Sequence, residues 1–465
     1  MRKQLPAPIL LLWLVAATLL LTACAGTAVR ENFAAVQDTT RSRLGADVEW
    51  LTTDASRQQA QARVDTLLAR PLGADDAVRI ALAYSPAVQA LLFESAARSA
   101  QATQAARPPN PVFAFERLVR LEAGVHEVEI GRVLAFSLYD LLLLPARMRV
   151  ADLQQQKMHL ELVAQVVQAA TDTREAWVRA VAAQQSLVYF EQVGSAADAS
   201  AELARRMQEA GNFSALQRAR EQAFSAEAMV QLARARQNAR GTREALVRRL
   251  GLTPSQATAL ALPDRLPDLP ATARSEPTVL QAALEQRLDL RLAKADLAFL
   301  AEEQGLTRVT GFVNGITVAG VRNTETGRTS QRGYELEFPL PLFDFGDAAR
   351  LRSESSYMAA VYRTAQVAVD ASSQVREAYD AYRAADDLAK RYRDDIVPLR
   401  QAIADENLLR YNGMLIGVFD LLADARERIA SVIQAIDAQR DFWLADAALQ
   451  AALIGRPTDP FARDP

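Results

Sequence analysis

The sequence predicts a mainly α-helical protomer with a small β part, built from two copies of one structural unit. Two stretches have the pattern of helices far longer than a compact domain needs. Each of them follows a pair of short segments in which apolar and charged residues alternate. Sequence landmarks recur at an offset of about 203 residues, which indicates an internal duplication.

The N-terminus has the features of a secretory signal. Arg2 and Lys3 precede an apolar run over residues 9–21, and small residues follow that run. The run is too short to span a bilayer comfortably, because spanning takes about 20 residues. We therefore expect a signal peptide over residues 1–23.

The only cysteine of the chain directly follows this signal. The residues L-T-A-C at 21–24 resemble the bacterial lipobox, in which the cysteine is lipidated and becomes the mature N-terminus. We therefore expect Cys24 to carry lipid, palmitate included. Ala25 favours the outer membrane, because an Asp there would resemble an inner-membrane retention signal.

The duplicated landmarks also define the domain boundaries. The segment at 134–141 matches 338–345, and the segment at 210–216 matches 412–419 with one residue more in the second copy. The predicted division is signal peptide 1–23, lipidated N-terminal segment 24–73, first structural repeat 74–251, Pro-rich linker 252–276, second structural repeat 277–455 and C-terminal tail 456–465.

Each repeat is predicted to open with a helix, over 74–106 and over 278–306, and the P-P-N-P run at 108–111 closes the first of these. An extended hairpin follows in each repeat. The predicted strands are 112–121 and 125–137 in the first copy and 308–318 and 332–341 in the second.

A very long helix comes next in each repeat, over 146–209 and 347–411, with interruptions expected near Gly194 and Pro398. A helix of about 65 residues is about 100 Å long, so it needs packing partners along its length. Coiled-coil spacings of four and seven residues relate Leu162, Val166, Ala170, Trp177, Val181 and Val188. The closing helices are predicted over 214–250 and 416–454.

The helices alone favour a periplasmic bundle or stalk without a pore, but the strands favour a pore. One strand face is apolar and the other is charged, as in outer-membrane strands, which also have about ten residues. The apolar positions are Phe113, Phe115, Val119, Leu121, Val128, Ile130, Leu336, Phe338 and Leu340, and the charged ones include Glu116, Arg120, Glu127, Glu129, Glu335 and Glu337.

Four strands cannot close a barrel, and open edges cannot stand in lipid. Three chains would supply twelve strands around an aqueous lumen, which makes a trimer the smallest conducting ring. A soluble antiparallel sheet with one solvated face has the same alternation and remains the alternative.

Several motifs, in their order along the two repeats, together resemble the TolC family of outer-membrane efflux proteins over nearly all of the mature chain. They are A-L-A-Y-S-P at 81–86, P-P-N-P at 108–111, L-Y-D-L-L-L-L-P-A-R at 138–147, P-L-P-L-F-D-F-G at 339–346, and the segments A-G-N-F-S-A-L and R-Y-N-G-M-L-I-G-V-F-D-L-L. The resemblance implies a homotrimer with a twelve-stranded barrel in outer-membrane lipid and a coiled-coil helical tunnel in the periplasm. It also implies a periplasmic adaptor and an inner-membrane pump as partners, in efflux or type I secretion.

The resemblance places functional residues at the helix-reversing tips. Gly211, Asn212, Tyr411, Asn412 and Gly413 fall where family members contact the adaptor. Glycine and asparagine also tolerate a left-handed backbone, so turn formation accounts for these residues as well.

Two carboxylates follow the second tip. Asp420 matches an acidic position near the periplasmic entrance of related tunnels, and Asp424 lies one turn further along the same helix. In a trimer these carboxylates would line the entrance and favour cations. The family's second acidic position falls on Ala423, so two solvated surface carboxylates are the alternative.

Other classes of function find less support. The formal charge of −3 gives no bulk attraction to nucleic acid. One cysteine and two histidines cannot form a thiolate or imidazole metal site, and no Ser/His/Asp or Cys/His set is present after processing. We expect no cofactor and no enzymatic activity. The remaining alternative is a lipid-anchored periplasmic coiled-coil scaffold without a pore, and the transported substrate could be a drug, a metal ion or a polypeptide.

Overall fold

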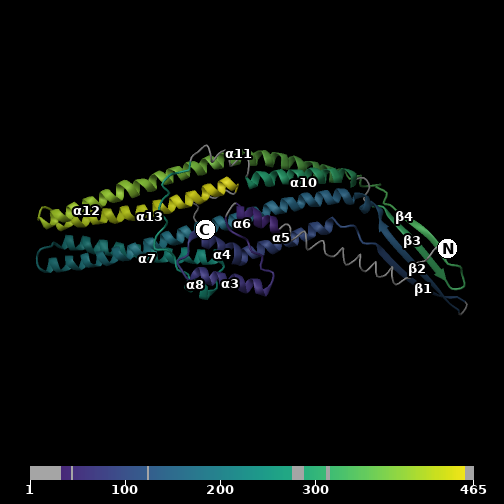
Figure 1. Cartoon of the computed structure of the whole chain (residues 1–465), viewed down its shortest axis with the longest axis horizontal. Helices are drawn as coiled ribbons and strands as arrows, with labels where there is room; N and C mark the ends of the chain where they lie inside the picture. The colour runs from purple at the N-terminus through teal and green to yellow at the C-terminus, as the bar shows by residue number, and fades with distance from the viewer. Residues whose placement is uncertain (1–32, 43–44, 123–124, 275–286, 311–314, 456–465) are drawn as a thin grey trace. The chain divides into compact units, whose positions relative to one another are not determined.

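The computed structural model describes residues 33–42, 45–122, 125–274, 287–310 and 315–455 (Figure 1). These residues form long helices and one four-stranded sheet, so the predicted mainly α fold with a small β part is confirmed. The expected signal peptide 1–23, Cys24 and the tail 456–465 lie outside the described residues.

The chain divides into two compact units, and each combines segments of both sequence repeats. We call the unit with Phe93–Glu161 and Leu290–Ala368 the strand unit. The unit with Gln37–Leu92, Leu162–Asp289 and Val369–Pro465 is called the helical unit.

The order of elements is the same in the two halves of the chain, as an internal duplication requires. The first half contains α4 (Ala74–Tyr84), α5 (Pro86–Ala105), β1 (Val112–Glu122), β2 (Val125–Ser137), α6 (Leu138–Glu209) and α7 (Ala215–Leu250). The second contains α10 (Leu288–Thr310), β3 (Thr317–Glu325), β4 (Gln331–Glu337), α11 (Asp347–Arg391), the π-helix η1 (Tyr392–Ile396), α12 (Val397–Asn412) and α13 (Val418–Ile454). The helix α3 (Asp54–Leu68) precedes the first half, and α8 (Pro254–Ala259) lies between the halves.

The predicted opening helix 74–106 is wrong in one respect, because two helices occupy it. Ser85 has a ψ of 126°, outside the helical region, and ends α4 before Pro86 begins α5. Proline lacks an N–H donor and disfavours a helical conformation in the residue before it. Within the described part of the chain, no single helix is long and apolar enough to cross a membrane; only α4 and α5 taken together pass, with a 45° bend between them.

The long helix of the first half begins earlier than predicted and has no break near Gly194. The Ser137 hydroxyl accepts a hydrogen bond from the Asp140 amide (3.2 Å), and this cap starts α6 at Leu138. At Gly194 an added Cβ would lie 3.4 Å from the Leu232 side chain, so α7 packs closely there and the helix continues. The break predicted near Pro398 is confirmed by η1, which directly precedes α12.

The first predicted hairpin is confirmed, and the second is shifted. Strand β3 starts at Thr317 rather than at 308, because α10 continues to Thr310. Strand β4 ends at Glu337 rather than at 341, because Pro339 has no N–H to pair with a neighbouring strand. The sheet order is β1-β2-β3-β4 with antiparallel pairing throughout, so β1 and β4 are its edges (Figure 1).

The strand register defines two chemically different faces, since directly paired residues share a face. The apolar face contains Phe113, Phe115, Val119, Leu121, Val128, Ile130, Leu134, Phe136, Val318, Tyr334 and Leu336. The acidic face contains Glu116, Glu127, Glu129, Glu325, Glu335 and Glu337. The apolar side chains of β1 and β4 are exposed to solvent in the single chain.

The helical unit has a continuous apolar core around Trp177 of α6. Its indole Nε1 donates a hydrogen bond to the Leu72 carbonyl (2.7 Å), which satisfies the one polar atom of this buried ring. The predicted packing positions Leu162, Val166, Ala170, Trp177 and Val181 are buried, whereas Val188 is exposed in the single chain.

Arg287, which is fully buried, ties three segments of the helical unit together. Its guanidinium donates to the backbone carbonyls of Ala371 (3.1 Å) and Ala452 (2.9 Å), and to the Gln374 side chain (2.9 Å). It also forms a bidentate ion pair with Asp289, at 3.0 and 2.6 Å. The Ala452 carbonyl belongs to the last turn of α13, where it also accepts a hydrogen bond from the cap amide of Gly455 (3.2 Å).

Replacing Arg287 with Ala should lower the free energy of unfolding by about 3–5 kcal/mol, because it breaks the ion pair of a buried guanidinium and removes the hydrogen bonds that tie α11 and α13 to the segment before α10. The thermal unfolding midpoint in detergent checks this. Arg291→Ala removes an exposed arginine four residues away and is the matched control. Equal midpoints for the two variants would contradict the anchoring role.

Candidate functional site

Two helix-reversing turns lie at the same end of the helical unit, where α6 meets α7 and α12 meets α13 (Figure 1). All five tip residues predicted from the sequence fall in or beside these turns. The first turn joins Glu209 to Ala215, and the second joins Asn412 to Val418.

The first turn is a Schellman motif centred on Gly211. The Asn212 amide donates to the Met207 carbonyl (2.8 Å), and the Gly211 amide donates to Gln208 (2.9 Å). Gly211 has a φ of +78°, which glycine adopts without strain. Ser214 then caps α7 in a reciprocal capping box with Gln217.

The second turn has the same hydrogen bonds, but a different residue takes the left-handed position. The Leu415 amide donates to the Arg410 carbonyl (2.8 Å), and the Met414 amide donates to Tyr411 (2.9 Å). Met414 has a φ of +59°, while Gly413 has a φ of −78°. The left-handed residue here is therefore Met414 rather than Asn412 or Gly413.

This geometry corrects the alignment of the two turns. Met414 is the counterpart of Gly211, and the cap residue Gly417 is the counterpart of Ser214. The turns therefore match without the extra residue that the sequence comparison placed in the second copy. The comparison paired the two glycines by identity, whereas the backbone hydrogen bonds pair residues by position.

Met414 and Leu415 are the functional candidates that the sequence reasoning missed. Their exposed fractions are 94% and 77%. A left-handed conformation costs a residue with a Cβ about 1–2 kcal/mol, and strained residues of this kind cluster at functional sites. Three consecutive large apolar residues between Gly413 and Gly417, in a turn, were the available signal.

Asp420 and Asp424 differ in their surroundings. Asp420 is exposed, and its carboxylate accepts a hydrogen bond from the Gly417 amide (3.2 Å), so it caps the start of α13. Asp424 is half-buried, and its Oδ2 is buried with no hydrogen-bond partner in the described chain. A single chain therefore accounts for the position of Asp420 but leaves an unpaired buried oxygen on Asp424.

A buried ion pair connects the two hairpins close to these residues. Glu221 of α7 accepts from the Arg426 guanidinium (2.8 Å) and from the Ser200 hydroxyl (2.9 Å). The Arg426 guanidinium carbon also lies 4.3 Å from the centre of the Phe224 ring. These contacts fix α13 against α6 and α7 just behind the turns.

An exposed charge network stiffens the end of α6. Glu202 accepts hydrogen bonds from Arg205 (2.8 Å) and Arg206 (2.8 Å), and Arg205 also contacts Glu209. The hydrogen bonds from Arg205 and then Arg206 lower the pKa of the Glu202 carboxyl to about 2. Its contribution to stability is therefore present above the ordinary glutamate pKa and is lost only as the pH falls towards 2.

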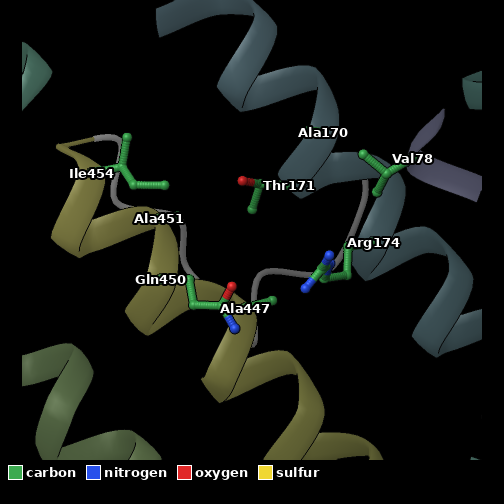
Figure 2. A pocket seen from close by; sticks show the side chains of 8 residues that line it. All are labelled: Val78, Ala170, Thr171, Arg174, Ala447, Gln450, Ala451 and Ile454. Carbon is green, nitrogen blue, oxygen red and sulfur yellow. The ribbon is translucent and has the colours of Figure 1, made fainter. Parts of the chain in front are cut away.

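A pocket of about 190 Å³ lies farther along the helical unit, between α4, α6 and α13 (Figure 2). Figure 2 shows Val78, Ala170, Thr171, Arg174, Ala447, Gln450, Ala451 and Ile454 around it. The polar groups are already paired: Thr171 with the Val167 carbonyl, Arg174 with Asp75, and Gln450 with Asp446. Nothing in this lining calls for a ligand, and we interpret the pocket as a packing gap.

The fold is that of outer-membrane channels of known structure. A membrane protein from Pseudomonas aeruginosa is 20% identical with a TM-score of 0.69, and the match covers 82% of this chain and 92% of that chain. The CmeC outer membrane channel of Campylobacter jejuni is 13% identical with a TM-score of 0.69, covering 84% and 87%. The outer membrane protein VceC of Vibrio cholerae is 16% identical with a TM-score of 0.67, covering 86% and 98%.

No protein-family model and no curated protein matches the sequence. The structural matches extend over most of the length of each chain compared, and they have the same combination of long helices and strands. The chain therefore has the TolC-like fold that its sequence motifs resemble.

The two glycines of the tips should respond differently to alanine. Gly211→Ala should destabilise its turn by about 1 kcal/mol through backbone strain alone, because no atom lies within 4 Å of the new Cβ. Gly413→Ala should be close to neutral, because φ is −78° and the new Cβ meets its neighbours at 3.5 Å or more. Hydrogen exchange of the amides at each turn measures the difference, and equal effects would refute the corrected alignment.

Proposed function

We propose that this chain is the protomer of a trimeric outer-membrane channel-tunnel. It serves as a passive conduit in a tripartite efflux or type I secretion system, between an inner-membrane pump with its periplasmic adaptor and the cell exterior. The observation that carries this proposal is the sheet, which has one apolar face, one acidic face and two open edges.

The open edges require further strands. Each edge of the four-stranded sheet has unpaired backbone groups, and such groups cost several kcal/mol each in lipid. Three copies supply twelve strands and close the ring without a free edge. In this ring the apolar face contacts lipid and the acidic face lines the lumen, which makes the lumen attractive to cations.

The two tips are the proposed adaptor contacts, through Gly211, Asn212, Tyr411, Asn412 and Gly413. Met414 and Leu415 add an exposed apolar pair to the second tip. Burying such a pair against a partner protein gains about 1.5–3 kcal/mol per side chain, which would offset the strain at Met414.

The proposed entrance comprises Asp420 and Asp424, backed by the ion pair of Glu221 and Arg426. The buried oxygen of Asp424 and the buried Nε of Arg426 have no partners in the described single chain. Neighbouring copies around a three-fold axis can supply the missing hydrogen bonds, which supports an entrance that is completed only in the trimer.

The proposed location is the outer membrane, with lipid on Cys24 as a second anchor and the helices in the periplasm. The chain itself performs no chemistry in this proposal, because energy comes from the pump. Within the described residues, no group of three His, Cys, Asp or Glu side chains could hold a metal ion.

Conduction by a trimer is the direct test. The lipidated protein, purified in detergent, should have the mass of three chains and should produce stepwise conductance in planar bilayers. A coiled-coil scaffold without a pore instead predicts a monomer or dimer that never conducts. A monomer that does not enter the bilayer would overturn the channel proposal.

Removing the entrance carboxylates should reduce cation selectivity. Asp420→Asn combined with Asp424→Asn keeps the shape and the capping acceptor of Asp420 but removes both charges. We expect the cation-to-anion permeability ratio, measured from reversal potentials, to fall several-fold, because the carboxylate ring is lost. Asp405→Asn, which removes one exposed carboxylate on α12, is the control. An unchanged ratio in the double variant would mean that these residues are solvated surface carboxylates.

Photo-crosslinking tests the tip. A crosslinking amino acid at Met414 should form an adduct that mass spectrometry identifies as a periplasmic adaptor. The same amino acid at Val230, which is exposed on α7 away from the turn, should not. Adaptor adducts at Val230 but not at Met414 would exclude the tip as the contact.

A further inference from the structure

The apolar face of the sheet carries a row of arginines. The register pairs Arg132 of β2 directly with Arg322 of β3, and Arg322 directly with Arg332 of β4. Arg117 of β1 lies on the same face, two positions nearer to the strand turns than this row, because it pairs with Ile130. We call these four residues the arginine row.

The arginine row has no counter-ion on its own face. Among the strand side chains that the structure describes, every glutamate lies on the acidic face. Within the same described residues, Arg322 has the neutral partner Ser330 (3.3 Å), and no ion pair involves Arg117, Arg132 or Arg332. Like charges directly opposite each other on a sheet are destabilising. We therefore expect anions from outside the chain to neutralise the arginine row.

The neighbours of the row show what surrounds it. Phe115 is paired with Arg132, and Tyr334 follows Arg332 on the same face of β4 with 86% of its surface exposed. On the side towards the helices, the face continues with Phe113, Leu134, Phe136 and Leu336. An aromatic residue between an apolar band and cationic residues is typical of a membrane interface.

The position along the strands gives the level of that interface. Helix α6 begins directly after Ser137 of β2, which pairs with Thr317 of β3, so the strand turns lie at the opposite end of the sheet. Arg332 is the second residue of β4, directly after the β3–β4 turn, so on β3 and β4 the row lies on the turn side of Val318, Tyr334 and Leu336. On β1 and β2 the apolar residues Val119, Leu121, Val128 and Ile130 lie between the row and the turn. Arginine stems can extend along an apolar surface and carry the charge to the headgroup level.

From this geometry we propose that Arg117, Arg132, Arg322 and Arg332 bind the phosphate groups of membrane lipids at the headgroup level nearest the strand turns. The inference rests on the proposed function, because it needs the apolar face to contact lipid. Guanidinium groups bind phosphate oxygens in bidentate fashion. In a trimer the row repeats three times around the barrel, forming a belt that fixes the depth of the protein in the membrane.

The test compares anionic and zwitterionic lipid on the intact trimer. Phosphatidylglycerol added to the detergent-purified protein should raise the thermal unfolding midpoint, and native mass spectrometry should show it bound. Phosphatidylcholine, whose phosphate is masked by choline, should do so much less. In the variant R132Q/R322Q/R332Q the apparent affinity for phosphatidylglycerol should fall by about a hundredfold, since each of the three arginines near a lipid surface contributes about 1 kcal/mol.

Arg120→Gln is the matched control, because Arg120 is an arginine of the same sheet on the acidic face; it should bind phosphatidylglycerol like the unaltered protein. If the triple variant does not assemble, Arg332→Gln alone replaces it and should still bind several-fold less than Arg120→Gln. Equal binding of the two lipids, equal binding by the row variant and the control, or the same stabilisation by inorganic phosphate would each overturn the lipid assignment.

Failure of the lipid assignment is distinguishable from failure of the channel proposal. A trimer that conducts in planar bilayers but shows no preference for phosphatidylglycerol overturns the lipid belt alone. A protein that neither assembles as a trimer nor conducts overturns the channel proposal and the belt with it.

Discussion

The open edges of the sheet are the constraint on which the rest of this structure depends. A four-stranded antiparallel sheet with exposed apolar side chains on its edge strands is prone to pair with other chains in water, and its unpaired backbone groups cannot stand in lipid. In the proposed trimer, three copies pair these edges, so that the apolar face contacts lipid and the acidic face contacts water. Long helices accompany this sheet: α6 alone has 72 residues and a length of about 110 Å.

The tips show how one backbone motif can serve two purposes. Both turns use the same Schellman hydrogen bonds, and the first places glycine where the left-handed backbone needs it. The second places Met414 there, at a local cost that the turn does not require. An apolar partner surface is the simplest compensation, because it would bury the side chain that glycine lacks. The difference between the repeats therefore points to the second tip as the stronger contact.

Charge is segregated throughout the chain in a way that matches this assembly. Glutamates occupy the proposed lumen face of the sheet together with Arg120, and Arg117, Arg132, Arg322 and Arg332 lie on the proposed lipid face, while Arg287 and Glu221 are buried with full sets of partners. The buried groups bind segments of the helical unit to one another. In the proposed assembly the exposed charges of the sheet face water or headgroups, where a charge needs no partner within the chain.

Much of the fold was predictable from the sequence, because it depends on local patterns. Alternation predicted β1 and β2, and helical periodicity with glycine and asparagine predicted the helices and the positions of both turns. The errors came where a local pattern competed with packing or capping. Gly194 does not break α6 because α7 packs against it, and Ser137 starts α6 early by capping it.

The candidate site was predicted less completely than the fold. The sequence by itself determined the class of fold, the two-faced strands and the residues at the tips, since each depends on neighbours within a few positions. Only the tertiary structure decided that Met414 rather than Gly413 is strained, that Arg426 binds Glu221 some 200 residues away, and that three arginines align across β2, β3 and β4. Strand register and helix packing set these contacts, and both join residues whose separation along the chain carries no periodic signal.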